Sequence, residues 1–287
     1  MPPRPDDSHK GSFGTVLVIG GCDDADSCMV GGPAFSALGA LRCGVGRVVM
    51  AAPRGILGHC LEVAPSATGV PIDSIAFEDR DRLRGRLDEY QAIVLGPGLG
   101  QGPVAEQCVH SVLGSGTGTP VILDADGLNI VARSHGSILD SECRLVLTPH
   151  PGEYDRLAVA MGLGGVPGTD DQRLEAARAL SDKLGVVVVL KGKGTVVAFG
   201  GSTWVCRRGT PSLATAGTGD VLTGIIAGLV AQTRSERPPS LWTMACLGVW
   251  IHAVSGEQWS VEHGESGLMA VELAAEVPSV MRSASRS

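Results

Sequence analysis

The chain has 287 residues, enough to bury a hydrophobic core without disulfide or metal support, as one large α/β domain or two small ones. Its formal net charge is −7 and its longest basic run is Arg207-Arg208, which argues against a nucleic-acid-binding surface. No apolar run approaches the roughly 20 residues of a membrane-spanning helix, and the polar start MPPRPDDSHK lacks the apolar segment of a signal peptide. We expect a soluble, cytoplasmic protein.

Short apolar runs closed by glycine or proline alternate with helical patterns along the chain. The predicted strands are Thr15–Gly20, Arg47–Ala52, Ala92–Gly96, Val121–Asp124, Leu145–Thr148 and Val186–Leu190, followed by a hairpin of Thr195–Phe199 and Thr203–Cys206 around Gly200-Gly201. The predicted helices are Gly32–Cys43, Val104–Leu113, Gly152–Met161, Asp170–Leu184, Asp220–Ala231, Leu241–Trp259 and Leu268–Val280. Gly162–Gly168 and Thr233–Pro239 are predicted loops, and Arg282–Ser287 a frayed tail.

The predicted strands are apolar throughout instead of alternating with polar residues, which is typical of parallel sheets covered on both faces. We therefore predict one three-layer α/β/α domain over residues 1–287, with an ordered core from about residue 10 to about 280. Most of the eight cysteines lie inside apolar stretches and none forms a C-x-x-C pair, so they are predicted to be reduced and buried.

Five glycine-rich or polar turns directly follow predicted strands. In open α/β sheets ligands bind beyond the carboxyl ends of the strands, so these turns are expected to meet at one ligand-binding edge. No G-x-x-x-x-G-K-[ST] sequence is present, and no G-x-G-x-x-G follows a strand, which argues against a P-loop ATPase and a standard dinucleotide domain. The five turns are Gly20-Gly21, Gly96–Gly100, Asp124–Asp126, Thr148–Glu153 and Lys191–Thr195.

The sequence Gly217-Thr218-Gly219-Asp220 precedes an apolar helical segment. Glycines leave backbone N–H groups free at a helix start, so Gly217, Thr218 and Gly219 are predicted to form an anion hole for phosphate. Asp220 is the predicted catalytic base, which would take the proton of an attacking hydroxyl. The alternative is that Asp220 only caps the helix.

Other polar residues have two interpretations each. Lys191 either contacts phosphate or is a solvated turn residue, and Glu153 either holds Mg²⁺ through water or complements a helix dipole. His150, between two prolines, is predicted to contact a ligand. Of Asp124 and Asp126, one is expected to orient substrate or metal. The buried helix that carries Trp250 and His252 is expected to be core, so these two residues are not placed in the site.

Taken together, these motifs resemble the ribokinase-like NAD(P)H-hydrate dehydratases, which repair hydrated nicotinamide cofactors. The resemblance runs in order from about Lys10 to about Val280. It rests on His9–Gly11 leading into Gly14–Gly21, Gly31–Pro33, Ala40–Gly46, Gly96–Leu99, Leu123–Asn129, Thr148–Glu153, Leu190–Thr195 and Leu213–Gly224. The family usually has alanine at the position of Gly32, and glycine there is expected to leave room with less contact.

The resemblance implies a repair reaction and assigns the site residues. The hydroxyl of (6S)-NADHX or NADPHX is phosphorylated by an adenine nucleotide, and loss of phosphate regenerates NADH or NADPH. The positions that match hydrate contacts are Gly32, Gly98, His150 and Asp220. The positions that match contacts to the adenine nucleotide are Lys191, Gly192, Lys193, Gly194, Thr195 and Gly219.

The resemblance also implies Mg²⁺, ADP or ATP as phosphoryl donor, a homo-oligomer with a tetramer as the candidate state, and a separate epimerase as functional partner. The motif style favours ADP over ATP, and a stand-alone dehydratase is expected. Two alternatives remain at this point: a small-molecule kinase of the hydroxyethylthiazole or hydroxymethylpyrimidine type, and a non-catalytic nucleotide-binding sensor.

Overall fold

The computed structural model describes residues 4–24, 27–75, 77–134, 141–165, 168–233 and 240–284. Its main feature is a nine-stranded sheet in the order β11-β10-β9-β8-β7-β6-β1-β4-β5. The seven strands from β9 to β5 are mutually parallel, while β10 runs antiparallel to both of its neighbours, β9 and the edge strand β11. Among the described residues, no helix is both long and apolar enough to cross a membrane.

The strands and helices have the following bounds. The strands are β1 (Thr15–Ile19), β2 (Cys22–Asp23), β3 (Cys28–Met29), β4 (Arg47–Ala52), β5 (Thr68–Pro71), β6 (Ala92–Leu95), β7 (Val121–Leu123), β8 (Leu145–Leu147), β9 (Val187–Leu190), β10 (Val196–Phe199) and β11 (Ser202–Val205). The helices are α1 (Gly31–Arg42), α2 (Arg54–Val63), α3 (Arg80–Leu87), α4 (Pro103–Gly114), α5 (Asp126–Arg133), α6 (Pro151–Ala160), α7 (Asp170–Leu184), α8 (Thr218–Ala231), α9 (Leu241–His263) and α10 (Ala270–Ala284).

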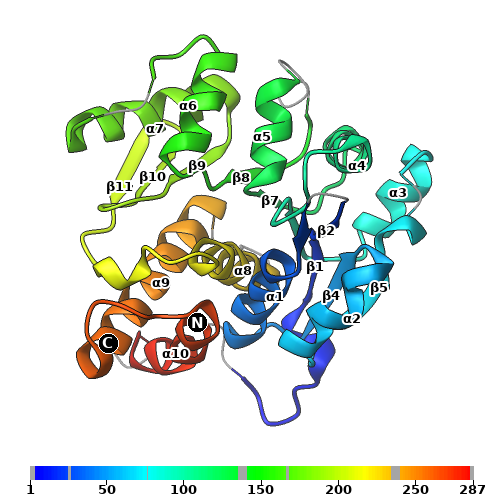
Figure 1. The fold of residues 1–287 in the computed structure, drawn as a ribbon, viewed down its shortest axis with the longest axis horizontal. Coiled ribbons are helices and arrows are strands. Elements are labelled where there is room, and N and C mark those ends of the chain that lie inside the picture. The colour runs from blue at the N-terminus through cyan, green and yellow to red at the C-terminus, as the bar shows by residue number, and fades with distance from the viewer. Residues whose placement is uncertain are drawn as a thin grey trace.

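Helices cover both faces of the sheet and make three layers. Alternate residues of β1 point to opposite sides, so that Val16 and Val18 join one core and Leu17 and Ile19 join the other. The first core packs against α1, α2, α8, α9 and α10, and the second packs against α3 to α7. Figure 1 shows α5, α6 and α7 on the opposite side of the sheet from α8, α9 and α10. The predicted α/β class with a mainly parallel central sheet is confirmed.

Helices α1 and α8 approach each other more closely than ordinary side chains allow. A Cβ built on Gly224 would lie 2.0 Å from the carbonyl oxygen of Ser36, and one on Gly39 would lie 2.4 Å from that of Val221. Only glycine fits such contacts, since real Cβ atoms essentially never come within 3.0 Å of another heavy atom. This backbone-to-backbone packing fixes the start of α8 relative to α1 and the sheet.

The predicted elements match the structure at most positions. Strand β4 and helix α7 have the predicted bounds, and the hairpin around Gly200-Gly201 lies at the sheet edge as expected. Helices α2, α3 and α5 and strand β5 were not predicted. They are short, and α3 (sequence RDRLRGRL) buries only Leu83 and Leu87, so it carries little periodic signal. Residues 166–167 and 234–239 of the two predicted loops lie outside the described residues.

The chain ends differ from the predicted polar tails. Arg282 belongs to α10, which continues to Ala284, so the predicted fraying is wrong for this part. Near the other end, the guanidinium of Arg4 lies 4.0 Å from the ring centre of Phe13 and donates to the carbonyl oxygen of Gly44. All eight cysteines are free, and six are buried as predicted, whereas Cys28 is exposed and Cys246 is partly buried.

Candidate active site

The five predicted turns meet at one edge of the sheet because the strands before them are parallel neighbours. Hydrogen bonds join the first turn to the second, the second to the third and the fourth to the fifth. The N–H of Gly21 donates to the carbonyl of Pro97 at 3.0 Å, and that of Gly100 donates to Asp126 at 2.9 Å. The N–H of Lys191 donates to Pro149 at 2.8 Å. The predicted convergence is therefore confirmed, and the polar groups of these turns lie close together.

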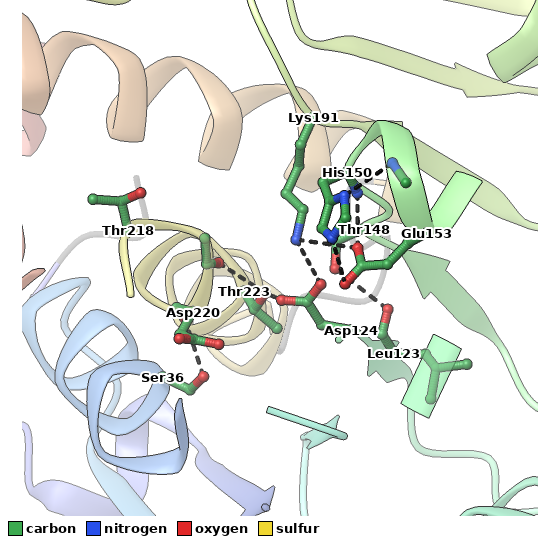
Figure 2. Close-up of polar contacts among 12 residues, drawn as sticks. Ser36, Leu123, Asp124, Thr148, His150, Glu153, Lys191, Thr218, Asp220 and Thr223 are labelled. Atoms are coloured by element: carbon green, nitrogen blue, oxygen red, sulfur yellow. Dashed lines mark hydrogen bonds and ion pairs between the residues drawn. The ribbon is translucent and has the colours of Figure 1, made fainter. Parts of the chain in front are cut away.

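Asp124, directly after β7, is the buried centre of this edge. Its side chain is 1% exposed, and each carboxylate oxygen has its own donor. Oδ1 accepts from Nζ of Lys191 at 2.7 Å and Oδ2 accepts from the hydroxyl of Thr223 at 2.7 Å. Figure 2 shows Asp124 between these two partners. A buried carboxylate with charge-assisted bonds on both oxygens has a fixed orientation.

The turn after Asp124 carries backbone strain. Ala125 has φ +50° and ψ −119°, and it is the one residue other than glycine with a positive φ in the described part of the chain. Such a conformation costs on the order of 1–3 kcal/mol and persists only where the surroundings impose it. The carbonyl of Asp124 also comes so close to Gly96 that a Cβ there would lie 2.1 Å from it. The tight packing around this turn thus imposes the backbone conformation in which the side chain of Asp124 is buried.

Lys191 extends from the end of β9 into this site, and its side chain is 17% exposed. Besides its bond to Asp124, Nζ lies 3.8 Å from Oε2 of Glu153. Burial by itself lowers the pKa of Lys191, but the nearby carboxylates of Asp124 and Glu153 outweigh it and raise the pKa. The lysine is therefore a permanent cation held in the site. The alternative of a solvated turn lysine is wrong.

His150 and Glu153 form a reciprocal cap at the start of α6. Nδ1 of His150 accepts from the N–H of Gly152 at 3.0 Å, and Oε2 of Glu153 accepts from the N–H of His150 at 2.8 Å. Glu153 is 5% exposed, and burial raises its pKa while Lys191 lowers it. The imidazole is about half exposed and its pKa is lowered, first by burial and then by Lys191. Both residues hold the turn together, and the exposed part of His150 remains open to a ligand.

The Gly217–Asp220 turn is the start of α8. Gly217, with φ +89°, is the N-cap residue, and a Cβ there would lie 2.6 Å from the ring of Phe35. The N–H of Thr218 donates to the carbonyl of Thr215 at 3.3 Å. In the described structure the next two N–H groups, those of Gly219 and Asp220, have no acceptor. Of the predicted anion hole, the amide of Thr218 is therefore engaged, while those of Gly217 and Gly219 have no acceptor among the described residues and that of Asp220 joins them.

Asp220 lies in the first turn of α8, with no capping hydrogen bond from its side chain. The alternative of a capping aspartate is therefore wrong. Within the described ranges its carboxylate has neither a hydrogen-bond donor nor an ion-pair partner. Its pKa is raised from 3.8 to about 8, first by burial and then by the charge of Asp124, while Lys191 opposes both. A carboxylate with a pKa near neutrality and a free oxygen is suited to accept a proton.

Three side chains hold this turn: two buried hydroxyls that the sequence did not single out and one partly buried histidine that it assigned to the core. The hydroxyl of Ser36 on α1 donates to the carbonyl of Asp220 at 3.1 Å. Nε2 of His252 on α9 lies 2.9 Å from the carbonyl of Thr218 and therefore carries the proton, since a carbonyl only accepts. Thr223, one turn further along α8, binds Asp124. Burial lowers the pKa of His252 to about 4, so this histidine is neutral. The prediction that His252 is core holds for its burial but misses its contact with the turn.

The predicted nucleotide loop, Lys191–Thr195, connects β9 to the antiparallel strand β10. A Cβ built on Gly219 would lie 3.4 Å from Nζ of Lys191, so this loop and the start of α8 are adjacent. Gly192 has φ +141° and lies against Arg173 of α7, whose guanidinium donates to the carbonyls of Leu190 and Lys191 at 3.2 Å each. Lys193 is exposed. Arg173 therefore holds the first residues of this loop in place, a role that the sequence analysis did not predict.

Gly32 and Gly98, the predicted hydrate contacts, lie against each other. A Cβ built on Gly32 would come within 2.7 Å of the carbonyl carbon of Pro97 and 2.8 Å of the amide nitrogen of Gly98. The expectation that glycine leaves room at this position is therefore wrong, because the space is filled by backbone. Gly98 has φ +62°, a conformation that favours glycine.

The carboxylates fit a magnesium ion only in part. Oxygen ligands are the ones Mg²⁺ prefers, but both oxygens of Asp124 are already bonded and Glu153 caps α6. Across the described residues, no three His, Cys, Asp or Glu side chains are grouped so as to hold a metal ion. Most ligands of a Mg²⁺ ion here would therefore come from water and a nucleotide, as is usual for this ion.

Comparison with known proteins identifies the family. The model of the NAD(P)H-hydrate dehydratase family matches residues 16–279. The chain belongs to this family. The ADP-dependent (S)-NAD(P)H-hydrate dehydratase of Bacillus subtilis (strain 168) is 35% identical over 288 residues, which cover 98% of this chain and 94% of that protein.

The family also contains longer proteins. The bifunctional NAD(P)H-hydrate repair enzyme Nnr of Moorella thermoacetica is 35% identical over 288 residues, 98% of this chain but 52% of its own length. The chain thus spans about half the length of this relative.

A solved structure extends the comparison to the fold. The Bacillus subtilis ADP/ATP-dependent NAD(P)H-hydrate dehydratase, co-crystallized with ATP/Mg²⁺, is similar with a TM-score of 0.81 at 33% identity. The superposition covers 99% of this chain and 94% of that one. The predicted ribokinase-like fold of the dehydratase family is confirmed.

Proposed function

We propose that this protein uses an adenine nucleotide to dehydrate (6S)-NADHX or NADPHX to NADH or NADPH. One observation carries the proposal: the unpaired Asp220 carboxylate, with a pKa of about 8, lies in a helix turn with two free amides and beside the Lys191 ammonium. A base and an anion site in one turn are what phosphoryl transfer to a hydroxyl requires. Membership of the dehydratase family supplies the substrate.

The proposed reaction has two steps. In the first, Asp220 takes the proton of the ring hydroxyl, and the hydroxyl oxygen attacks the terminal phosphorus of the nucleotide. The bond between this phosphorus and the bridging oxygen of the nucleotide breaks. In the second, the C–O bond to the new phosphate breaks, a proton leaves the neighbouring ring carbon, and the double bond of NADH or NADPH forms. With ADP the products are AMP, phosphate and the reduced cofactor.

The residues of this chain divide the work of the first step. Lys191 and the amides of Gly219 and Asp220 attract the anionic phosphates, since a helix N-terminus and an ammonium both favour negative charge. Gly192, Lys193, Gly194 and Thr195 follow Lys191 and are proposed to contact the nucleotide, while Gly32, Gly98 and His150 are proposed to contact the hydrate. Gly217 and Thr218 shape the turn. Bound Mg²⁺ would supply further positive charge at the phosphates, and Glu153 is the residue that would hold it through water.

The test is to incubate the protein with NADHX and either ADP or ATP and to follow the return of the NADH absorbance band. Recovery of NADH, faster with ADP, is expected. No recovery with either nucleotide would contradict the proposal. Release of a stable phosphorylated product from a thiazole or pyrimidine alcohol would favour the small-molecule kinase, and nucleotide binding without turnover of any substrate would favour the sensor.

Further properties follow from the same proposal. We propose that the whole chain forms one catalytic domain, supported by the single nine-stranded sheet to which both halves of the chain contribute. A cytoplasmic location, a homo-oligomer and functional coupling to an NAD(P)H-hydrate epimerase are also proposed. The bifunctional names of longer relatives such as that of Moorella thermoacetica are consistent with such coupling. Native mass spectrometry tests the oligomer.

A further inference from the structure

Thr223 is a fully buried hydroxyl that no step of the proposed reaction uses. Its Oγ1 lies 2.7 Å from Oδ2 of Asp124 and 3.1 Å from the carbonyl of Gly219. A threonine hydroxyl has one proton to donate. The shorter contact, to a carboxylate, is the stronger one and takes that proton. Thr223 thus connects α8, which carries Asp220, to the end of β7.

The bond from Thr223 decides the orientation of Asp124. The backbone of Asp124 is fixed, because its N–H donates to Leu95 at 3.1 Å and its carbonyl accepts from Gly127 at 3.0 Å. The side chain still has freedom to rotate, and the two donors on its two oxygens remove that freedom. If Thr223 loses its hydroxyl, Oδ2 is buried without a donor, which strongly disfavours the present orientation of the carboxylate.

Asp124 in turn holds Lys191 in an electrostatically unfavourable place. The ammonium lies next to the first turn of α8, where the helix dipole is positive, so it is repelled from there in the absence of an anion. The bond of 2.7 Å to Asp124 is the shortest contact that opposes this repulsion, and the contact with Glu153 at 3.8 Å adds to it. Figure 2 shows the chain of contacts from Thr223 through Asp124 to Lys191. The result is two positive groups side by side, which is what an anionic phosphate needs.

We propose that Thr223 is a positioning residue for nucleotide binding: its hydroxyl fixes Asp124, and Asp124 holds the Lys191 ammonium at the start of α8. This inference rests on the proposed use of an adenine nucleotide and assigns a role to a residue that does not touch it. The charged groups around Asp220 come from different elements, namely Asp124, Asp126, Glu153 and Lys191. Thr223 acts on this set through Asp124 alone.

The first experiment compares three single variants by calorimetric titration with ADP and by steady-state kinetics. Thr223→Val keeps the shape and removes the hydroxyl, and we expect a rise in the ADP dissociation constant of about tenfold or more. Thr223→Ser keeps the hydroxyl, and its ADP affinity is expected to stay within about threefold of the parent. Thr119→Val is the matched control, because Thr119 is also buried but lies outside the five turns and donates only to the backbone carbonyls of Leu87 and Tyr90.

The second experiment is a double-mutant cycle between Thr223→Val and Asp124→Asn. If Thr223 acts through Asp124, the double variant binds ADP no more weakly than Asp124→Asn alone, so the two effects do not add. The KM for nucleotide is expected to rise more than kcat falls. Thr223→Cys serves as a second variant if Thr223→Val does not fold, because a thiol fills similar space but is a weak donor.

Several results would overturn the inference: additive effects in the cycle, equal losses in Thr223→Ser and Thr223→Val, or Thr223→Val binding ADP like Thr119→Val. Failure of the proposed function looks different, because then the parent protein itself forms no NADH. In that case ADP affinity and crystal structures still decide the inference. The Lys191–Asp124 contact is expected to be lost in Thr223→Val and kept in Thr223→Ser.

Discussion

Replacing Asp220 by asparagine removes the proposed base with almost no change of shape. We expect kcat to fall by about 10²–10⁴-fold, the usual contribution of a general base. Nucleotide affinity is expected to stay the same or improve, because the substitution removes a negative charge from a site that binds phosphate. The assay is the return of NADH absorbance from NADHX with saturating ADP, alongside calorimetric titration with ADP.

The pH dependence of the parent protein tests the same assignment. With a pKa of about 8, Asp220 is deprotonated in only about a tenth of the unliganded molecules at pH 7. Because the base acts as the carboxylate, kcat/KM is expected to rise about tenfold per pH unit below about 8 and to level off above it. This limb should be absent from the residual activity of Asp220→Asn.

Stability is expected to change in the opposite direction from activity. The pKa of Asp220 is higher in the folded protein, about 8, than its ordinary value of 3.8. The folded state therefore binds more protons, and the free energy of unfolding falls as pH rises from about 4 to about 8. The asparagine side chain of the variant has no charge to bury. We expect Asp220→Asn to be more stable than the parent by about 1–3 kcal/mol at pH 8, allowing for solvent near the site, and equal at pH 4.

The control is Asp171→Asn, which changes an exposed aspartate in the first turn of α7 and is expected to affect neither rate nor stability appreciably. Two results would refute the reasoning. An unchanged turnover in Asp220→Asn removes Asp220 from the mechanism. A variant that loses both activity and stability at pH 8 indicates a structural role instead.

Three further predictions concern single substitutions near the site. Lys191→Met is expected to raise the KM for nucleotide at least about tenfold, because a charged hydrogen-bond donor is lost. Steady-state kinetics measure the KM, and an unchanged value would argue against contact between Lys191 and phosphate. Ala125→Gly is expected to raise the free energy of unfolding by up to about 2 kcal/mol, since glycine adopts φ +50° without strain. Urea denaturation measures this free energy, and a decrease would mean that the turn is unstrained. Gly224→Ala should cost about 1–3 kcal/mol by the same method, because its Cβ would lie 2.0 Å from the carbonyl of Ser36. Gly58→Ala on α2, with open space around it, is the control and should be neutral or stabilising.

Sequence reasoning indicated the candidate site but not the hydrogen bonds that connect its residues. Asp220, Lys191, His150 and Glu153 each follow a strand or begin a helix, and such positions are readable from local pattern. The roles of Thr223 and Ser36 cannot be read from local pattern. A threonine or serine within an apolar helix has no local feature that shows whether its hydroxyl bonds to a distant residue or to the backbone of its own helix. Asp124 was noticed, but its partners lie 67 and 99 residues away in the chain. Sequence reasoning also left Asp220 as a possible cap, which the position of Gly217 as N-cap excludes.

The fold, too, could be predicted from the sequence in part, while other features depend on tertiary contacts. A parallel sheet covered on both faces could be predicted from the residue pattern, since continuously apolar strands such as β6 and β9 have no polar side to present to water. The same pattern also indicated that the turns after these strands share one edge, because parallel strands end on the same side. Which groups in those turns are paired and which are free depends on contacts between segments that are far apart in the chain. Asp124 and Lys191 are paired with each other, whereas Asp220 is left unpaired and partly dehydrated. Burial and the charge of Asp124, which is distant in sequence, raise the pKa of Asp220.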